Sequence, residues 1–141
     1  MIIYISGEPI GKGRPRFAKR GSFVSAYTPE KTKAYEDHVK ECFDDQHCYD
    51  KEVEELRDKP LRICITAYMG IPKSTSKGKA QDMRIGKTKP TKKPDVDNIA
   101  KIILDALNGI AYEDDKQVVE LLVQKKYSEQ PHVVVELTEV K

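Results

Sequence analysis

Residues 93–115, KPDVDNIAKIILDALNGIAYEDD, contain the strongest helical pattern of the chain. From Asn98 to Asn108 the apolar side chains recur every three or four residues, which is the spacing of one face of an α-helix. Gly109 follows, and glycine is a common residue just past the end of a helix. The segment therefore predicts an amphipathic helix that packs one face against the core.

The most distinct strand pattern is Leu61 to Met69, where apolar and polar residues alternate. Two-residue alternation or a short apolar run also predicts strands at Met1–Ser6, Phe23–Tyr27, Val118–Tyr127 and His132–Thr138. Residues 128–131, SEQP, have the composition of a turn. We therefore expect the last two strands to form a hairpin.

A second helix is predicted to begin at residues 28–30, Thr-Pro-Glu. Threonine suits the N-cap, proline the first turn, and glutamate the positive end of the helix dipole. This helix should end near Gln46, before an acidic linker that reaches Pro60. Residues 70–94 show no periodicity and predict a long mobile loop. The expected fold is α+β, with a mixed sheet and two main helices packed on one side.

The composition is that of one globular domain, residues 1–141. The chain is 38% hydrophobic and 34% charged, and no apolar run is long enough to cross a membrane. The first residues are apolar and then basic, the reverse of a secretory signal, so we expect a cytoplasmic protein. The three cysteines lack CxxC spacing, which argues against a zinc site or a disulfide framework.

Positive charge is concentrated in two segments, 11–20 and 73–93, which hold a single acidic residue between them, Asp82. Such segments attract polyanions, although lysine-rich surface is also common on proteins that bind none. The residues expected to contact DNA phosphates are Lys12, Arg14, Arg16, Lys89, Lys92 and Lys93. The aromatic residues Phe17, Phe23 and Tyr27 could stack on exposed bases, but packing within a hairpin is the simpler expectation.

Acidic residues flank the predicted helix of residues 98–108. Asp95 and Asp97 are two apart, so in extended backbone both carboxylates can face one ion. The spacing is equally consistent with Asp97 capping the helix and Asp95 facing water. The triplet 113–115 could be only a polar turn. A helix of about 11 residues is roughly 16 Å long, so the triplet reaches the other aspartates only if the chain doubles back.

Hard divalent cations such as Mg²⁺ prefer carboxylate oxygens and keep positions open for water and phosphate. Acidic residues in a chain with two basic segments therefore suggest metal-assisted cleavage of nucleic acid. Lys101 lies one helical turn after Asp97, where it could neutralise charge that develops on a phosphate oxygen. It could equally pair with Asp97 or Asp105.

Several of these residues together resemble the RusA family of Holliday junction resolvases, in its phage and prophage type. The resemblance rests on Asp95-Val96-Asp97-Asn98, Lys101, Asp105-Ala106-Leu107, Asp114-Asp115 and Gln117, and on the N-terminal GKGRPRF and YTPEKTKAYE. It covers most of the chain. The connection from Asp105 to Asp115 is slightly shorter than in the family pattern, which leaves both Asp114 and Asp115 as candidates for the third acidic position.

The resemblance implies that Asp95, Asp97 and Asp115 bind Mg²⁺, for which Mn²⁺ can substitute, and that Lys101 assists near the scissile phosphate. It also implies a homodimer that resolves four-way junctions by paired symmetrical nicks during DNA recombination and repair. Two alternatives stay open at this point. One is a branched-DNA-binding protein without catalysis, and the other is a nuclease that cuts flaps or forks.

Overall fold

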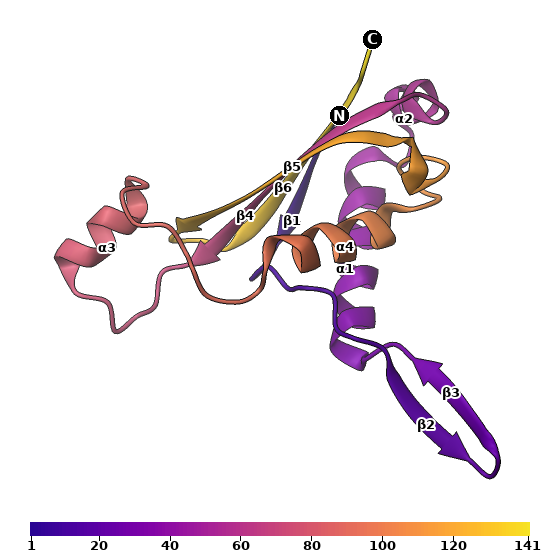
Figure 1. Cartoon of the computed structure of the whole chain (residues 1–141). Coiled ribbons are helices and arrows are strands. Elements are labelled where there is room, and N and C mark those ends of the chain that lie inside the picture. Colours follow the sequence, from indigo (N-terminus) through magenta and orange to yellow (C-terminus); the bar gives the residue numbers. More distant parts are fainter.

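The computed structural model describes all 141 residues. Its centre is a four-stranded sheet with the order β1 (Ile2–Ser6), β6 (His132–Glu139), β4 (Leu61–Gly70) and β5 (Val118–Ser128). Strands β1 and β4 each pair with β6 in antiparallel fashion, whereas β4 and β5 are parallel. The sheet is therefore mixed, as predicted (Figure 1).

Two helices, α1 (Glu30–His47) and α4 (Val96–Leu107), cover one face of this sheet (Figure 1). Alternate side chains of β4 point into the core below them, and Ile63 and Ile65 are fully buried. The apolar stripe of α4 meets them with Ile99, Ile102, Ile103, Ala106 and Leu107. The predicted α+β class and the two main helices on one side are confirmed. No helix of the structure combines the length and the apolarity that a membrane span requires.

The predicted hairpin between the last two strands is wrong. Strand β4 lies between β5 and β6, so residues 129–131 cross the end of β4 instead of turning between paired neighbours. Two alternating segments joined by a short turn look the same in either topology. The difference lies in the parallel pairing of β5 with β4, which leaves no local mark in the sequence.

Two short helices lie where no helix was predicted. Helix α2 (Lys51–Leu56) interrupts the acidic linker, and the side chain of Asp50 caps it by accepting a hydrogen bond from the Glu52 N–H at 2.9 Å. Helix α3 (Lys77–Arg84) lies inside the predicted mobile loop. It buries only Ala80, so it has no apolar stripe that could have revealed it.

The strands β2 (Arg16–Arg20) and β3 (Phe23–Tyr27) form a two-stranded hairpin that projects from the body of the molecule (Figure 1). The returning strand was predicted. The packing of its aromatic residues within the hairpin was not predicted correctly, because Phe17 is 71% exposed and Phe23 is 78% exposed. We call this hairpin the β2–β3 arm.

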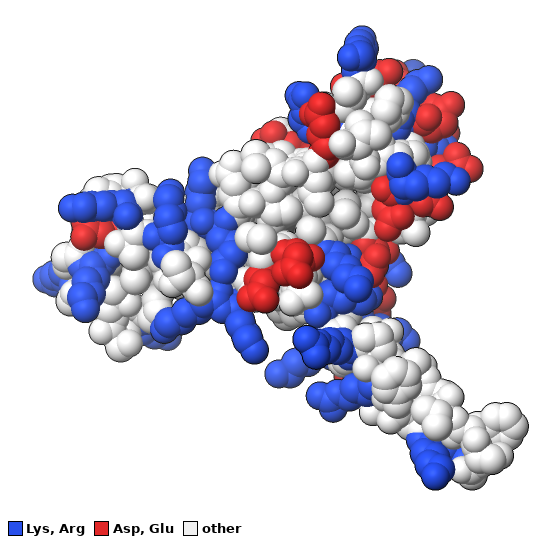
Figure 2. Space-filling model, viewed as in Figure 1, with Lys and Arg blue, Asp and Glu red and all other residues white.

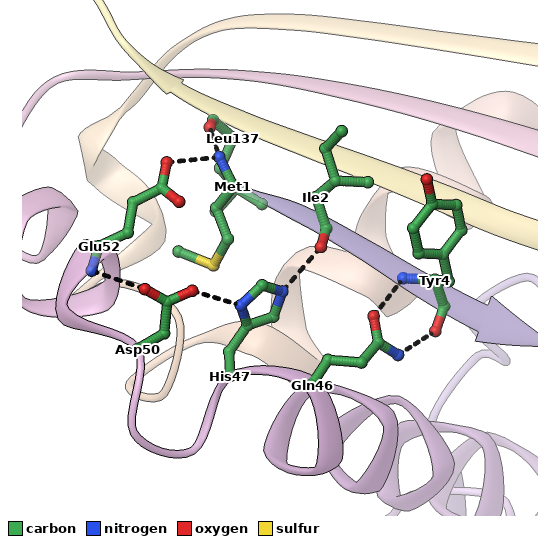
Figure 3. Close-up of polar contacts among 8 residues, drawn as sticks. All are labelled: Met1, Ile2, Tyr4, Gln46, His47, Asp50, Glu52 and Leu137. Atoms are coloured by element: carbon green, nitrogen blue, oxygen red, sulfur yellow. Dashed lines mark hydrogen bonds and ion pairs between the residues drawn. The ribbon is translucent and has the colours of Figure 1, made fainter.

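The two edges of the sheet differ in their free hydrogen-bonding groups. On β1, the Gln46 side chain accepts from the Tyr4 N–H at 2.9 Å and donates to the Tyr4 carbonyl at 2.7 Å, and His47 contacts the Ile2 carbonyl (Figure 3). No side chain or other strand bonds the outward backbone groups of β5. Because unpaired edges are templates for further strands, β5 is the edge open to another chain.

Candidate active site

Asp95 and Asp97 lie at the start of α4, and the helix does not use either carboxylate. Asp95 occupies the N-cap position, where its backbone carbonyl accepts from the Ile99 N–H at 3.0 Å, but its side chain makes no capping bond. Asp97 follows in the first turn. Both residues are exposed, and neither forms an ion pair. Asp97 therefore does not cap α4.

Lys101 is exposed on the next turn of α4 and forms no ion pair. Lys101 therefore pairs with neither Asp97 nor Asp105, so that alternative is wrong. Asp105 is instead bonded to Lys12, 3.2 Å from its ammonium nitrogen. The charge of Lys101 is left free to meet an anion near the two aspartates.

The N-terminal loop of residues 9–14 packs closely over the start of α4. The Lys12 N–H donates to the Asn98 carbonyl at 2.9 Å. At Gly11 a Cβ atom would lie 2.9 Å from the Pro94 Cβ and 3.0 Å from the Asn98 Cβ, so no larger side chain fits without moving the loop. The close approach of this loop to the helix forms one wall of a hollow.

This hollow has a volume of about 760 Å³, and its lining includes Arg14, Lys31, Lys93, Asp95 and Asn98. The structure therefore brings two predicted DNA contacts, Arg14 and Lys93, to the predicted ligand Asp95. Figure 2 shows Lys and Arg side chains on both sides of a small acidic area at the start of α4. Sequence reasoning missed Lys31, which lies in the first turn of α1, within the segment YTPEKTKAYE but outside both basic segments. We call this hollow the basic groove.

Lys12, by contrast, is engaged inside the protein. Its ammonium group donates to Glu36 at 2.6 Å and lies 3.2 Å from Asp105, and its side chain is 18% exposed. Burial alone would lower the pKa of Lys12, but the hydrogen bonds to Glu36 and Asp105 outweigh burial and raise that pKa above its usual value. Lys12 thereby ties the loop to both α1 and α4 and supports the wall of the basic groove.

Replacing Lys12 by methionine is expected to lower the free energy of unfolding by about 1–3 kcal/mol, because Glu36 and Asp105 lose their shared partner. Urea denaturation at neutral pH measures this loss. The raised pKa means that the stabilisation is complete below the unfolded-state pKa and disappears as the pH rises through the folded-state pKa. On the alkaline side, the difference in unfolding free energy between wild type and variant should therefore narrow only in strongly alkaline solution.

The control is Lys33→Met, since Lys33 is an exposed lysine of α1 without an ion pair. This variant should match the wild type within a few tenths of a kcal/mol. A Lys12→Met protein as stable as Lys33→Met would show that the ion pairs do not hold the loop.

The second acidic group lies in the 3₁₀ turn η1 (Asp115–Gln117). Asp114 caps this turn: its carboxylate accepts from the Lys116 N–H at 2.9 Å, while Gln117 accepts from the Asp114 N–H. The hydrogen bond from Lys116 is the main reason that the pKa of Asp114 is lowered. The pKa of the exposed Asp115 is raised, first by a loss of hydration and then by the neighbouring Asp114 and Asp105. Asp114 thus serves the turn, and the Asp115 side chain has no such task.

The three predicted metal ligands do not meet within one chain. The Asp115 N–H donates to the Asn108 side chain at 3.0 Å, so Asp115 lies at the far end of α4 from Asp95. The thirteen residue steps from Asp95 to Asn108 correspond to about 20 Å. No three His, Cys, Asp or Glu side chains of the chain are grouped so that they could hold a metal ion. A single chain therefore does not supply the three-carboxylate site.

The other predicted DNA contacts lie at the two ends of the surface that contains the basic groove. Arg16 begins the β2–β3 arm, whereas Lys89 and Lys92 lie in the segment between α3 and α4. All three are exposed and form no ion pair. Together with Arg14, Lys31 and Lys93 they offer a series of free cations from the arm to α3.

Comparison with known proteins agrees with this chemistry. The sequence profile of the family described as "Endodeoxyribonuclease RusA" matches residues 6–138. The chain is also 40% identical over 138 residues to "Uncharacterized protein YqaN" of Bacillus subtilis (strain 168), an alignment that covers 96% of this chain and 94% of the relative. The profile includes β4, α4, η1 and the aspartates at both ends of α4. The chain therefore belongs to the RusA family of endodeoxyribonucleases, which are DNA-cleaving hydrolases.

Proposed function

We propose that the protein is a Mg²⁺-dependent endodeoxyribonuclease that resolves four-way DNA junctions by paired symmetrical nicks, acting as a homodimer in recombination and repair. The observation that carries the proposal is the pair of unengaged carboxylates, Asp95 and Asp97, beside a groove with unpaired cations. Mn²⁺ is expected to substitute for Mg²⁺, because both accept carboxylate and water oxygens.

The chain's own residues would divide the work as follows. Arg14, Lys31 and Lys93 would hold the DNA backbone in the basic groove by phosphate contacts that weaken with salt. Lys101 would stabilise negative charge that develops on the scissile phosphate. The aspartates would hold the divalent cation, which when bound lowers the pKa of a water and polarises the phosphate.

The separation of Asp115 from Asp95 and Asp97 supports a site completed by a second copy. Helix α4 and strand β5 run in opposite directions: Asn108 at the end of the helix bonds Asp115 just before β5, and the Lys125 ammonium donates to the Lys92 carbonyl at 2.5 Å. Asp95 therefore lies roughly level with the middle of β5, while Asp115 precedes its start. In a two-fold dimer whose β5 strands pair in antiparallel fashion, the start of one β5 strand would lie toward the end of the other. Asp115 of one copy would then lie on the same side as Asp95 of the partner subunit.

Strand β5 has the surface that such a partner needs. Its outer backbone groups are unpaired, and three apolar side chains near its start are exposed: Val119 at 59%, Leu121 at 46% and Leu122 at 51%. Figure 2 shows an area without charged side chains over the middle of this strand. Exposed apolar residues on an unpaired edge favour pairing with another strand. We propose that two copies join through antiparallel β5 strands.

The dimensions support an axis near Leu121. Helix α4 is about 18 Å long and a strand advances about 3.3 Å per residue, so the start of α4 lies level with roughly the sixth residue of β5. Pairing about Leu121 would set the start of the partner's β5 opposite that position. Asp115 of the partner subunit would then approach Asp95 and Asp97, which is what a three-aspartate site requires.

The test is incubation of end-labelled four-way junctions with the protein and Mg²⁺. The expected result is paired nicks at symmetry-related positions on two opposite strands, and no nicks when EDTA removes the metal. Cuts confined to flaps or forks would favour the other nuclease. Binding to the junction without any cut, in Mg²⁺ or Mn²⁺, would favour a non-catalytic DNA-binding protein.

A further inference from the structure

The β2–β3 arm combines aromatic and basic side chains on the same face. Antiparallel pairing places Arg16 opposite Tyr27 and Arg20 opposite Phe23. Residues directly opposite one another in a hairpin share a face, and these two pairs are separated by a small pair, Ala18 and Ser25. Phe23 is 78% exposed and Tyr27 is 49% exposed. The arm therefore presents two arginine–aromatic pairs to its surroundings.

The body of the protein offers these side chains no partner. The two strands of the arm pack mainly on one another, and the hairpin extends away from the sheet and helices (Figure 1). An isolated two-stranded hairpin is only marginally stable in water. Aromatic residues exposed on such an element indicate a surface that is covered when a partner binds.

Charge identifies the kind of partner. No acidic residue occurs between Glu8 and Glu30, so the arm and the loop that leads to it are purely basic. The arm of a second copy would carry the same charge and be repelled, whereas a polyanion is complementary. Duplex DNA hides the faces of its bases in the stack. A branch point exposes them, and base faces stack well on aromatic rings.

The position of the arm fits such a substrate. Arg14 lines the basic groove together with Asp95, and the arm begins two residues later at Arg16. A DNA strand bound in the groove would therefore continue toward the arm. Because Lys12 ties the intervening loop to α1 and α4, the start of the arm is held at a defined place beside the groove.

We propose that the β2–β3 arm binds the branch point of DNA, with Phe23 and Tyr27 stacked on the base faces exposed there and Arg16 and Arg20 on the flanking phosphates. The inference rests on the proposed function in one respect: it takes branched DNA as the substrate, and it does not require that the DNA be cleaved. It assigns to the arm the preference for junction over duplex, which the aspartates and the groove do not explain.

The test compares binding of a four-way junction and of a duplex of equal length, without divalent metal so that no DNA is cut. Phe23→Ala is expected to weaken junction binding about tenfold and to leave duplex binding unchanged, since stacking is lost only where bases are exposed. Phe23→Trp should bind the junction as the wild type does, whereas Phe23→Leu should behave like Phe23→Ala because leucine has no flat ring. Circular dichroism should be the same for all, because Phe23 lies outside the core.

The control is Tyr49→Ala, an aromatic residue that is 97% exposed between α1 and α2 and should not affect either DNA. Junction binding by Phe23→Ala equal to wild type, an equal loss on duplex, or full binding by Phe23→Leu would each overturn the proposal. The proposal would also be overturned if Phe23→Ala sedimented as a monomer while its preference for junction over duplex stayed unchanged. Cleavage by the wild type is scored separately, so a protein that selects junctions through Phe23 but never nicks them would refute the proposed function and not this inference.

Discussion

A mixture of Asp95→Asn and Asp115→Asn chains, exchanged by unfolding and refolding together, is expected to nick four-way junctions although neither chain does so alone. Each substitution removes a proposed cation ligand, and a loss of several kcal/mol of transition-state stabilisation slows cleavage by roughly a thousandfold. In a mixed dimer, however, Asp95 and Asp97 of one copy meet an intact Asp115 from the other. One of the two sites is then complete, so the junction should receive single nicks.

The matched control is a mixture of Asp95→Asn with Asp97→Asn. These residues lie at the same end of α4, so every site of a mixed dimer lacks one of them and cleavage should not return. All three variants should still bind the junction, since the cations of the basic groove are untouched. An inactive mixture of Asp95→Asn and Asp115→Asn, with mixed dimers present by mass spectrometry, would show that the aspartates do not meet across the dimer.

Leu121→Lys is expected to convert the protein into a folded monomer that does not nick junctions. Leu121 lies near the proposed two-fold axis, where two copies of the new lysine would face each other. An unpaired charge buried at an interface costs several kcal/mol, so dimerisation should weaken by about a hundredfold or more. Sedimentation velocity reports the loss of dimer, and the junction assay reports the loss of cleavage.

The control for this charge is Ile2→Lys on the opposite edge of the sheet. Ile2 is 43% exposed and Leu121 is 46% exposed, so the two substitutions add the same group at similarly exposed sites. The β1 edge is already occupied by Gln46 and His47, and the Ile2 variant should stay dimeric and active (Figure 3). If Leu121→Lys also remained a dimer, the interface would have to lie elsewhere than β5.

The local sequence pattern was enough to predict those helices and strands that bury one face and expose the other. In α4 and β4 each buried side chain follows its predecessor at the helical or strand spacing, so the periodicity could be read without knowing the neighbours. Helix α3 escaped prediction because it buries a single alanine. Helix α2 escaped because it is short and acidic and depends on its Asp50 cap.

The chemistry of the candidate site was likewise present in the sequence, since Asp95, Asp97, Lys101 and Asp115 stand in a recognisable order. Their arrangement in space was not, because the distance between the ends of α4 depends on how η1 docks at Asn108. Lys31 lines the basic groove because α1 packs beside the loop of residues 9–14, and that packing cannot be read from the sequence. The engagement of Lys12 with Glu36 and Asp105 also depends on that packing.

Periodicity and the order of the motifs were thus sufficient to predict an α+β fold and a resemblance to a nuclease family, because both can be read from the linear sequence without knowing which segments meet in space. The insertion of β4 between β5 and β6, the unpaired edge of β5 and the separation of the aspartates all depend on contacts between distant segments. Such contacts form when apolar faces from the whole chain are buried together, and that is a property of the assembled core.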